Sequence, residues 1–270
     1  MRQTRQLRPA RTTSLRLAAG EVVSPHLHDE HQIVYASSGV LSVTTEAGSW
    51  IAPADRAIWV PAGTEHQHRA YGPTLLHAIG LAVRYNPLGL SAPAVLAVRP
   101  LLRELIATYT GDPPTGHAER TRMLAVLLDR LRHSPQQPIH IPVPSDSRLT
   151  AVCAILFDNP ADPRSLAQLA AGCGASERTL SRLFRAELGM TFPQWRTQLR
   201  LHLALRLLAD GTPVTTVAYR CGWASASTFI EVFRRTLGHT PGSYLDARRA
   251  DQWPEAFAEA SPAGAESSAR

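Results

Sequence analysis

Three histidines and a glutamine near the N-terminus have the residue types and spacing of a ligand site. His26 and His28 are separated by one residue, so on a strand both imidazoles point to the same face. Gln32 and His66 follow along the chain. Neutral imidazoles bind divalent transition metals, whereas the Gln amide is a weak ligand and the set contains no carboxylate. The four residues are therefore compatible with a metal site, with a pocket for an organic effector, or with hydrogen-bonded polar side chains.

Aromatic residues of the same stretch are further candidates for such a pocket. They are Tyr35, Trp50 and Trp59, and two more histidines, His31 and His68, are candidates for lining the same pocket. Aromatic side chains on strands also fill hydrophobic cores, so these residues fit either a binding pocket or a plain core.

A second set of polar residues lies near the C-terminus, on two stretches whose apolar residues recur at helical spacing. The apolar positions are Leu180, Leu183, Phe184 and Leu188 in one stretch, and Phe229, Val232, Phe233 and Leu237 in the other. The polar faces carry Glu177, Arg178, Ser181, Arg182 and Arg185, and then Ser227, Thr228, Glu231, Arg234 and Arg235. Such side chains can contact base edges and phosphates in a DNA major groove.

The two stretches belong to an internal repeat. Residues 169–192 read LAAGCGASERTLSRLFRAELGMTF, and residues 217–241 read VAYRCGWASASTFIEVFRRTLGHTP. Each copy has a short apolar helix, a turn with Gly, a second helix and a closing Gly, which is the pattern of a helix-turn-helix. Residues 194–208 are predicted to form one long helix between the copies. A stiff connector of this kind would allow both second helices to enter successive major grooves.

The repeat, its spacing and the run CGWASASTFIEVFRRTLGHTPGSY resemble the double helix-turn-helix domain of the AraC/XylS family of bacterial transcription regulators. The resemblance covers residues 146–249. By position in the family's motif, the base-reading residues are Arg178, Ser181 and Arg182 in the first copy, and Ser227 and Glu231, with Thr228 nearby, in the second. Arg185, Arg234 and Arg235 are assigned to phosphate or solvent. The resemblance also implies promoter DNA and RNA polymerase as partners, a homodimer, and activation of transcription.

The N-terminal stretch is predicted to be all-β. Between Ser14 and Val83, short β-branched and aromatic runs are divided by Gly, Pro and Ser, as in a sandwich or small barrel. The pattern Gly20-x5-His26-x-His28-x3-Gln32-x6-Gly39 resembles the first cupin motif, with Gln in place of the usual Glu, and Pro61-x-Gly63-x2-His66 resembles the core of the second. Asp55 and Ala70 depart from the Gly and Asn of the second motif.

Charge and composition favour a polyanionic partner. The net charge is +6, and all 28 basic residues are Arg. Residues 146–250 hold 13 Arg against 8 Asp and Glu, so most of the excess lies on the repeated segment. None of the three Cys forms CxxC, and packing is expected for Cys173 and Cys221. No apolar run approaches the ~18 residues of a membrane span or resembles a signal peptide, which favours the cytoplasm.

These observations predict an α+β protein of two domains, with a cupin-like β-barrel plus helices at the N-terminus and an all-α double helix-turn-helix at the C-terminus. Residues 1–12 and 250–270 are predicted to be disordered tails, residues 13–133 the effector-binding domain, residues 134–145 an extended linker, and residues 146–249 the DNA-binding domain. Residues 92–133 are predicted to be helical, with one helix marked by residues from Val95 to Ile106. These helices would form a dimer interface or pack on their own barrel.

The predicted function is a non-enzymatic, one-component regulator in which a small molecule or a metal, bound in the barrel, controls binding to promoter DNA. An alternative is a metal-dependent cupin enzyme fused to a DNA-binding domain. The absence of a carboxylate among His26, His28, Gln32 and His66 counts against that alternative. A third reading is a metal-sensing regulator, in which the cation itself is the signal.

Overall fold

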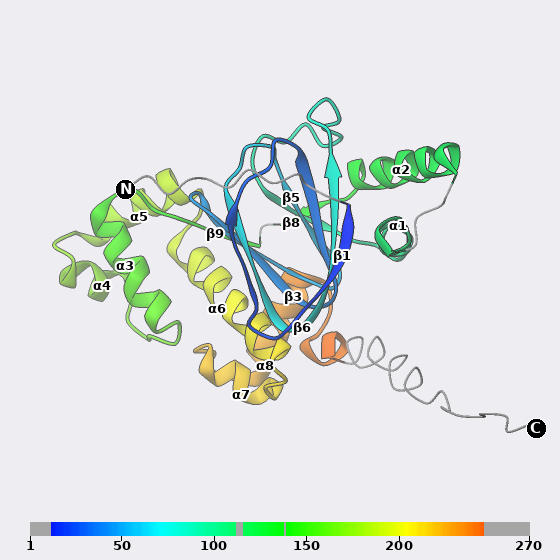
Figure 1. Cartoon of the computed structure of the whole chain (residues 1–270). Coiled ribbons are helices and arrows are strands. Elements are labelled where there is room, and N and C mark those ends of the chain that lie inside the picture. Colours follow the sequence, from blue (N-terminus) through cyan, green and yellow to red (C-terminus); the bar gives the residue numbers. More distant parts are fainter. Residues whose placement is uncertain (1–11, 112–115, 138, 246–270) are drawn as a thin grey trace, which may run out of the picture.

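The computed structural model describes residues 12–111, 116–137 and 139–245. A β-barrel-like sheet occupies the centre, two helices lie on one side of it, and the helices of the C-terminal half of the chain lie on the other (Figure 1). This arrangement confirms the predicted α+β class. The predicted tails, apart from Thr12, lie outside the described residues.

The sheet is built on two long antiparallel strands. The strands are β1 (Thr13–Leu17), β2 (Val22–His26), β3 (His31–Thr45), β4 (Gly48–Pro53), β5 (Arg56–Val60), β6 (His66–Leu81), β7 (Ala94–Ala97), β8 (Gln136–Gln137) and β9 (His140–Pro142). β3 and β6 pair from His31 opposite Leu81 to Thr44 opposite Gln67, with register shifts around Ser38. Such bulges bend long strands, which suits the curvature of a barrel.

Alternation along these strands sorts side chains to two faces. Val34, Leu41 and Val43 belong to the core inside the barrel, whereas Ile33, Tyr35 and Trp59 belong to a separate core on the outside. The outer core is covered by α1 (Pro100–Gly111) and α2 (His117–Arg132), through residues such as Leu102, Ile106 and Leu127. The sheet of the barrel therefore has an inner face that surrounds the barrel core and an outer face that α1 and α2 cover.

The helix predicted to run through Val95 begins later than expected. Val95 lies on β7, where it pairs with Ile58 of β5, and α1 starts at Pro100. A β-branched residue favours a strand, and a proline is well suited to the first turn of a helix, so the boundary between them follows from residue type.

Six helices of the C-terminal domain lie wholly within the described residues. They are α3 (Ser147–Asp158), α4 (Leu166–Gly172), α5 (Glu177–Leu188), α6 (Phe192–Ala209), α7 (Val214–Arg220) and α8 (Ala226–Leu237). Capping boxes begin α4 at Ser165 and α6 at Thr191. The long connecting helix predicted over residues 194–208 is α6, which is slightly longer at both ends. Cys221 is buried in the core beside it, and burial raises the pKa of its thiol to about 12, in keeping with the predicted packing role.

The segment predicted to be an extended linker, residues 134–145, contributes β8 and β9 to the sheet. β9 pairs with β4 from Gly48 opposite Pro142 to Trp50 opposite His140. Just after β9, a carboxylate oxygen of Glu187 accepts hydrogen bonds from the backbone N–H groups of Ser145 and Asp146, at 2.7 and 3.1 Å. The connection between the domains is therefore held at both ends.

The barrel and the second helix-turn-helix share one hydrophobic core. Leu201, Leu205 and Phe233 belong to the same cluster as the barrel residues Ile51 and Val34. At its edge, the buried Arg56 guanidinium donates to the carbonyl oxygen of Leu237, the last residue of α8, at 2.7 Å. The sequence did not predict this contact between the domains.

Candidate DNA-binding surface and effector site

α5 separates an apolar face from an arginine-rich one. Leu180, Leu183, Phe184 and Leu188 are buried, whereas Arg178, Arg182 and Arg185 are exposed and Ser181 is half-buried. The helix starts where the Ser176 side chain accepts a hydrogen bond from the backbone N–H of Thr179, and it ends at Gly189 in the left-handed conformation, with φ 67°. All four residues predicted to contact DNA from the first copy thus lie on its polar side.

α8 repeats this construction. Phe229, Phe233 and Leu237 are buried, and Ser225 caps the helix through the backbone N–H of Thr228. The predicted DNA contacts are all exposed: Ser227, Thr228, Glu231, Arg234 and Arg235. The Thr228 hydroxyl lies 3.0 Å from the Ser225 hydroxyl. Thr228 therefore takes part in the helix cap. Ser227 and Glu231 are the predicted base-reading residues of α8 that do not take part in it.

α6 connects the two helix-turn-helix units. Its 18 residues correspond to a rod of about 27 Å, slightly shorter than the ~34 Å between successive major grooves on one face of DNA. Trp195, Leu199 and Leu207 of this helix are buried, so it is packed on both units and its direction is set. Joint contact of Arg178 and Glu231 with one duplex remains a prediction.

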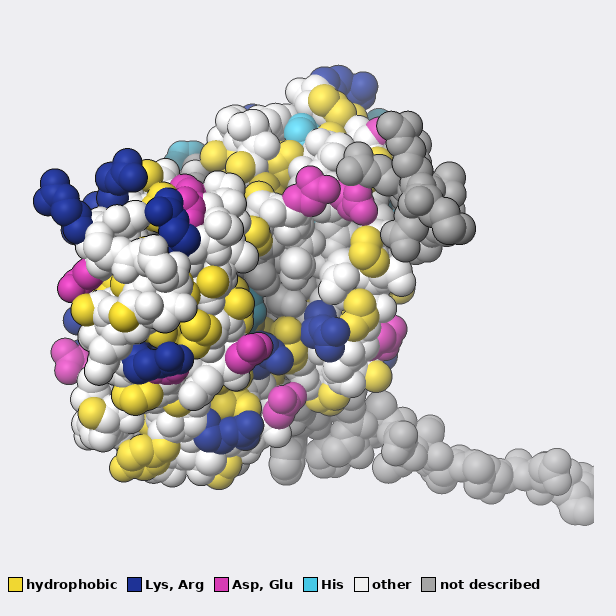
Figure 2. Space-filling model, turned by 90° about the vertical axis from the view of Figure 1, so that its left-hand side faces the viewer, with side chains coloured by type: hydrophobic (Ala, Val, Ile, Leu, Met, Phe, Trp, Pro, Cys, Tyr) yellow, Lys and Arg dark blue, Asp and Glu magenta, His cyan; other side chains and the backbone are white. Residues whose placement is uncertain are grey.

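Arginine side chains are exposed at several places on the face of the molecule shown in Figure 2, with acidic side chains between them. Three of the exposed arginines are close together on α5. On α5, Arg178, Arg182 and Arg185 line one hollow together with Ser181. A guanidinium can bind guanine bidentately or pair with phosphate, so this hollow has the chemistry of a DNA contact.

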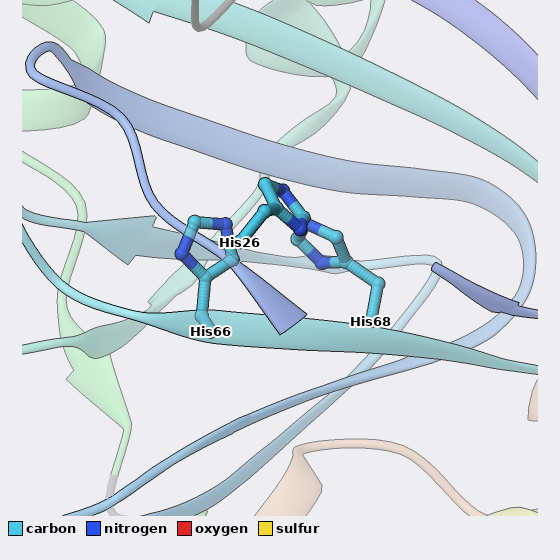
Figure 3. A group of neighbouring side chains, drawn as sticks. All are labelled: His26, His66 and His68. Atoms are coloured by element: carbon cyan, nitrogen blue, oxygen red, sulfur yellow. The ribbon is translucent and has the colours of Figure 1, made fainter. Parts of the chain in front are cut away.

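Histidines of two strands meet inside the barrel. His26 ends β2, and His66 and His68 lie on β6; one ring nitrogen from each lies within 4.8 Å of the others (Figure 3). His28 is adjacent, with its ring centroid 4.9 Å from that of His26 and 5.3 Å from that of His66. The structure therefore brings together the three histidines predicted as ligands and adds His68, which the sequence had indicated only as a residue of the pocket.

Backbone carbonyls fix the tautomers of two of these rings. The Nδ1 atom of His26 lies 2.7 Å from the Ser24 carbonyl oxygen, and that of His66 lies 2.8 Å from the Thr64 carbonyl oxygen. A carbonyl only accepts, so Nδ1 carries the proton and donates, and the lone pair is left on Nε2. This is the usual support of a histidine that binds a metal.

The cluster is buried, and burial disfavours the charged form of two of its imidazoles. Burial lowers the pKa of His66 to about 4, and burial together with the neighbouring imidazoles lowers that of His68 well below its ordinary value. Among the described residues, Nε2 of His66, Nδ1 of His68 and Oε1 of Gln32 are buried without a hydrogen-bond partner. Such atoms cost free energy unless something binds them.

The residues present fit a divalent transition metal. His26, His66 and His68 would hold it, with His28 alongside, and neutral imidazole nitrogen is a ligand that zinc, copper and nickel all accept. The sequence signal for His68 was available: His66-x-His68 has the same spacing as His26-x-His28 and therefore shares a strand face. Gln32 lies on β3, and its place in a ligand set remains a prediction.

The aromatic candidates are divided between the two faces of the sheet. Trp50 pairs with Val43, and Val43 pairs with His68, so Trp50 shares the inner face with the histidines. Tyr35 and Trp59 belong to the outer core under α1 and α2, and the Tyr35 hydroxyl donates to the Ala54 carbonyl oxygen at 2.8 Å. The His31 ring packs against the Trp59 ring there, with the centroids 4.8 Å apart and the planes tilted by 32°. Side chains alternate between the two faces along a strand, and Tyr35 and Trp59 point to the outer face. They therefore lie in the outer core, away from the histidine cluster.

Known proteins resemble both halves of the chain. Residues 14–81 match the family described as "Cupin domain", and residues 169–247 match the family described as "Helix-turn-helix domain". The chain is 35% identical over 231 residues to the HTH-type transcriptional regulator NimR of Escherichia coli (strain K12), and the match covers 83% of each chain. The chain belongs to the AraC/XylS family of transcription regulators.

Two further relatives of this AraC/XylS regulator match smaller shares of its chain. The HTH-type transcriptional regulator RipA of Corynebacterium glutamicum is 38% identical over 103 residues, which cover 38% of this chain and 31% of RipA. A solved structure of the DNA-binding domain of AdpA in complex with a target DNA is 34% identical and covers 40% of this chain and 97% of the AdpA chain, with a TM-score of 0.37. These relatives carry the names of transcription factors.

The described helices of this AraC/XylS regulator include none that is both long and apolar enough to span a bilayer. The predicted family, the cupin-like N-terminal domain and the double helix-turn-helix are confirmed. The individual DNA-contacting, effector and metal residues remain predictions.

Proposed function

We propose that this AraC/XylS regulator reads a promoter sequence with α5 and α8, and that an effector bound in its N-terminal domain sets its affinity for that DNA. The observation that carries the proposal is the repeated helix that buries its apolar face and exposes arginine and hydroxyl side chains on the other. In this scheme Arg178, Ser181 and Arg182 contact bases from α5, and Ser227 and Glu231 contact bases from α8.

Charge differs between the two reading helices. α5 presents three exposed arginines and has its exposed carboxylate, Glu177, in the first turn, whereas α8 presents Glu231 beside Arg234 and Arg235. A carboxylate near phosphates weakens binding, but it can accept from the N4 amino group of cytosine. The first unit would therefore supply most of the affinity, and the second unit would add discrimination at one base pair.

The effector proposed for the barrel is a divalent transition metal. When bound, the ion would supply a cross-link between β2 and β6 through His26, His66 and His68. The carbonyl oxygens of Ser24 and Thr64 orient two of the ligands, and burial lowers the pKa of His66 and His68, which favours their neutral form. Strand β6 also lies next to α6. Metal binding that makes β6 more rigid can therefore affect the DNA-binding domain through α6.

Genome-wide footprinting followed by gel shifts on the recovered sites tests the proposal. Untagged protein should protect a small set of promoter sequences, and added Zn²⁺, Co²⁺ or Ni²⁺ should change its affinity for them in a way that EDTA reverses. Uniform binding to all DNA would contradict sequence-specific reading. If none of the metals changes the affinity for promoter DNA, the protein still binds DNA but a metal is not its effector.

Three further properties belong to the proposal. They are contact with RNA polymerase, activation of the neighbouring promoter, and a homodimer formed through α1 and α2. α2 presents the exposed Val126, and α1 presents the exposed Leu101, as expected for helices that another subunit could cover. Sedimentation of the full chain and transcription from a bound promoter in vitro would test these properties.

A further inference from the structure

The C-terminal ends of both reading helices are held by charged hydrogen bonds. On α5, the Glu187 carboxylate accepts from the backbone N–H groups of Ser145 and Asp146, at 2.7 and 3.1 Å. On α8, the carbonyl oxygen of Leu237 accepts from the Arg56 guanidinium at 2.7 Å. Both contacts lie in the last turn of the helix, beyond the residues proposed to read bases, so they do not compete with contacts to DNA.

The contact of α5 reaches the barrel across one intervening residue. The backbone N–H of Val143, just after β9, still donates to the Ala47 carbonyl oxygen between β3 and β4, at 3.1 Å. Pro144 follows, and Ser145 already binds Glu187 through both its N–H and its hydroxyl, at 2.7 and 2.9 Å. The ring of Pro144 fixes its φ angle, so this short connection is stiff. The position of α5 is therefore coupled to the barrel.

The contact of α8 is part of a polar cluster at the turn between β4 and β5. Arg56 is buried, and its guanidinium also pairs with the Asp55 carboxylate at 2.5 Å. The same carboxylate lies 3.0 Å from Nε2 of His239, two residues after the end of α8. Two adjacent residues of the barrel thus hold the segment at the end of α8 through two contacts.

Strand β4 joins the two contacts. Its first residue, Gly48, pairs with Pro142 of β9, and its last residue, Pro53, comes two residues before Asp55. A Cβ atom on Gly48 would lie 2.5 Å from the Ile141 carbonyl oxygen, so the close approach of β9 to β4 requires a glycine there. The barrel therefore connects the ends of the two reading helices through a single strand.

The other connection between the two helix-turn-helix units is α6. Trp195, near its start, belongs to the core of the first unit, whereas Leu205, near its end, belongs to the core that the second unit shares with the barrel. The units also touch where a Cβ atom on Gly222 would lie 2.6 Å from the Cα atom of Ala161. Separate cores can turn against each other about the axis of α6, whereas a second connection through the barrel closes a ring and restricts that rotation.

We propose that Glu187 and Arg56 are positioning residues that fix the separation and relative rotation of α5 and α8. They thereby set the spacing that the regulator accepts between two half-sites, the stretches of DNA read by each helix. The inference rests on the proposed function, in which both helices read one duplex. One extra base pair between the half-sites moves the second by about 3.4 Å and turns it by about 35°. Helices that are held to the barrel cannot follow this change, whereas released helices can.

Gel shifts with the full chain, on promoter duplexes that differ only in this spacing, test the inference. The starting duplex is a site recovered by footprinting, and one base pair is added or removed between its two protected blocks. Each change should weaken binding of the wild type by about 10-fold or more, because base contacts of one helix are lost. In Glu187→Ala and in Arg56→Ala, the same change should weaken binding by about 3-fold or less, because the units can turn to follow the shifted half-site.

Two further variants separate positioning from a general effect on the fold. Glu187→Gln keeps an amide oxygen that can accept from the Ser145 N–H, so its loss of affinity should lie nearer to the loss of the wild type than to that of Glu187→Ala. Glu104→Ala removes an exposed carboxylate on α1 and should show the loss of the wild type. Each loss is a ratio of two affinities measured on one preparation, so a reduced folded fraction in Arg56→Ala cancels.

Two results would overturn the inference while the proposed function stands. In one, Glu187→Ala or Arg56→Ala loses as much affinity as the wild type when the spacing changes. In the other, the wild type binds the starting site specifically but tolerates the changed spacings. If the wild type binds the starting site no better than unrelated DNA, the proposed function itself fails.

Discussion

At the scale of single residues, the reading helix α5 depends on a few guanidinium groups. Arg182 is exposed at its centre, one turn after Arg178. We expect Arg182→Ala to weaken binding to the preferred promoter by ~1–3 kcal/mol and to relax one base position, because an arginine that contacts guanine contributes on that scale. A gel-shift series on single-base variants of the promoter measures both effects. An equal loss on every sequence would reassign Arg182 to phosphate.

The histidine cluster also permits a test at one residue. His68→Asn should weaken Co²⁺ or Zn²⁺ binding by about 10–100-fold or more, because even the loss of a supporting group around a metal costs that much. Equilibrium dialysis with metal analysis gives the affinity. His77→Gln is the matched control, since His77 is also a buried histidine of β6 but is not in the cluster. Equal metal affinity in His68→Asn and the wild type would remove His68 from the site.

At the scale of elements, His77 ties β6 to helix α1. Its Nδ1 lies 2.6 Å from the Thr110 hydroxyl, and its Nε2 lies 2.9 Å from the Ser37 hydroxyl. The Thr110 hydroxyl donates to the Ile106 carbonyl oxygen at 2.9 Å, so it accepts from Nδ1–H of a neutral imidazole. Burial lowers the pKa of His77 from 6.5 to about 4.

This lowered pKa has a defined sign for stability. Below pH 6.5 His77 is protonated in the unfolded chain, whereas in the folded chain it stays neutral down to about pH 4. The free energy of unfolding therefore falls as the pH drops from 6.5 to about 4. Between pH 7 and pH 5, His77 should account for a loss of about 1–2 kcal/mol in the free energy of unfolding. Urea denaturation of His77→Gln at both pH values should show a drop smaller by that amount. The same pH dependence in variant and wild type would contradict a neutral, buried His77.

At the scale of the whole molecule, Asp55 and Arg56 connect the barrel to the second helix-turn-helix. The Arg56 guanidinium pairs with the Asp55 carboxylate at 2.5 Å and donates to the Leu237 carbonyl oxygen, and Asp55 lies 3.0 Å from the Nε2 of His239. The carbonyls at the end of a helix have no partner within the helix, so Arg56 satisfies one of them across the domain boundary.

We expect Arg56→Ala to lower the free energy of unfolding by about 2–3 kcal/mol, because it leaves a buried carbonyl unsatisfied and removes a charged hydrogen bond. Arg103→Ala, in which an exposed arginine beside Glu104 is lost, should change it by less than about 0.5 kcal/mol. Urea denaturation of both variants measures the difference. Equal stability of the two would mean that the contact between the barrel and α8 adds nothing to the fold.

The amino-acid sequence by itself determined the units of this protein, since they depend on short-range patterns. The repeat in residues 169–192 and 217–241 required two helix-turn-helix units, the apolar spacing set which side of each helix is buried, and the strand pattern with paired histidines indicated a cupin-like barrel. Only the tertiary structure decided what lies next to what. In the structure, Tyr35 and Trp59 lie in the outer core, and Val95 lies on a strand instead of the predicted helix. His68 lies beside His26, and Arg56 contacts the end of α8. Each of these depends on which strands pair and how the domains dock, and periodicity along the chain does not encode contacts between residues far apart in it.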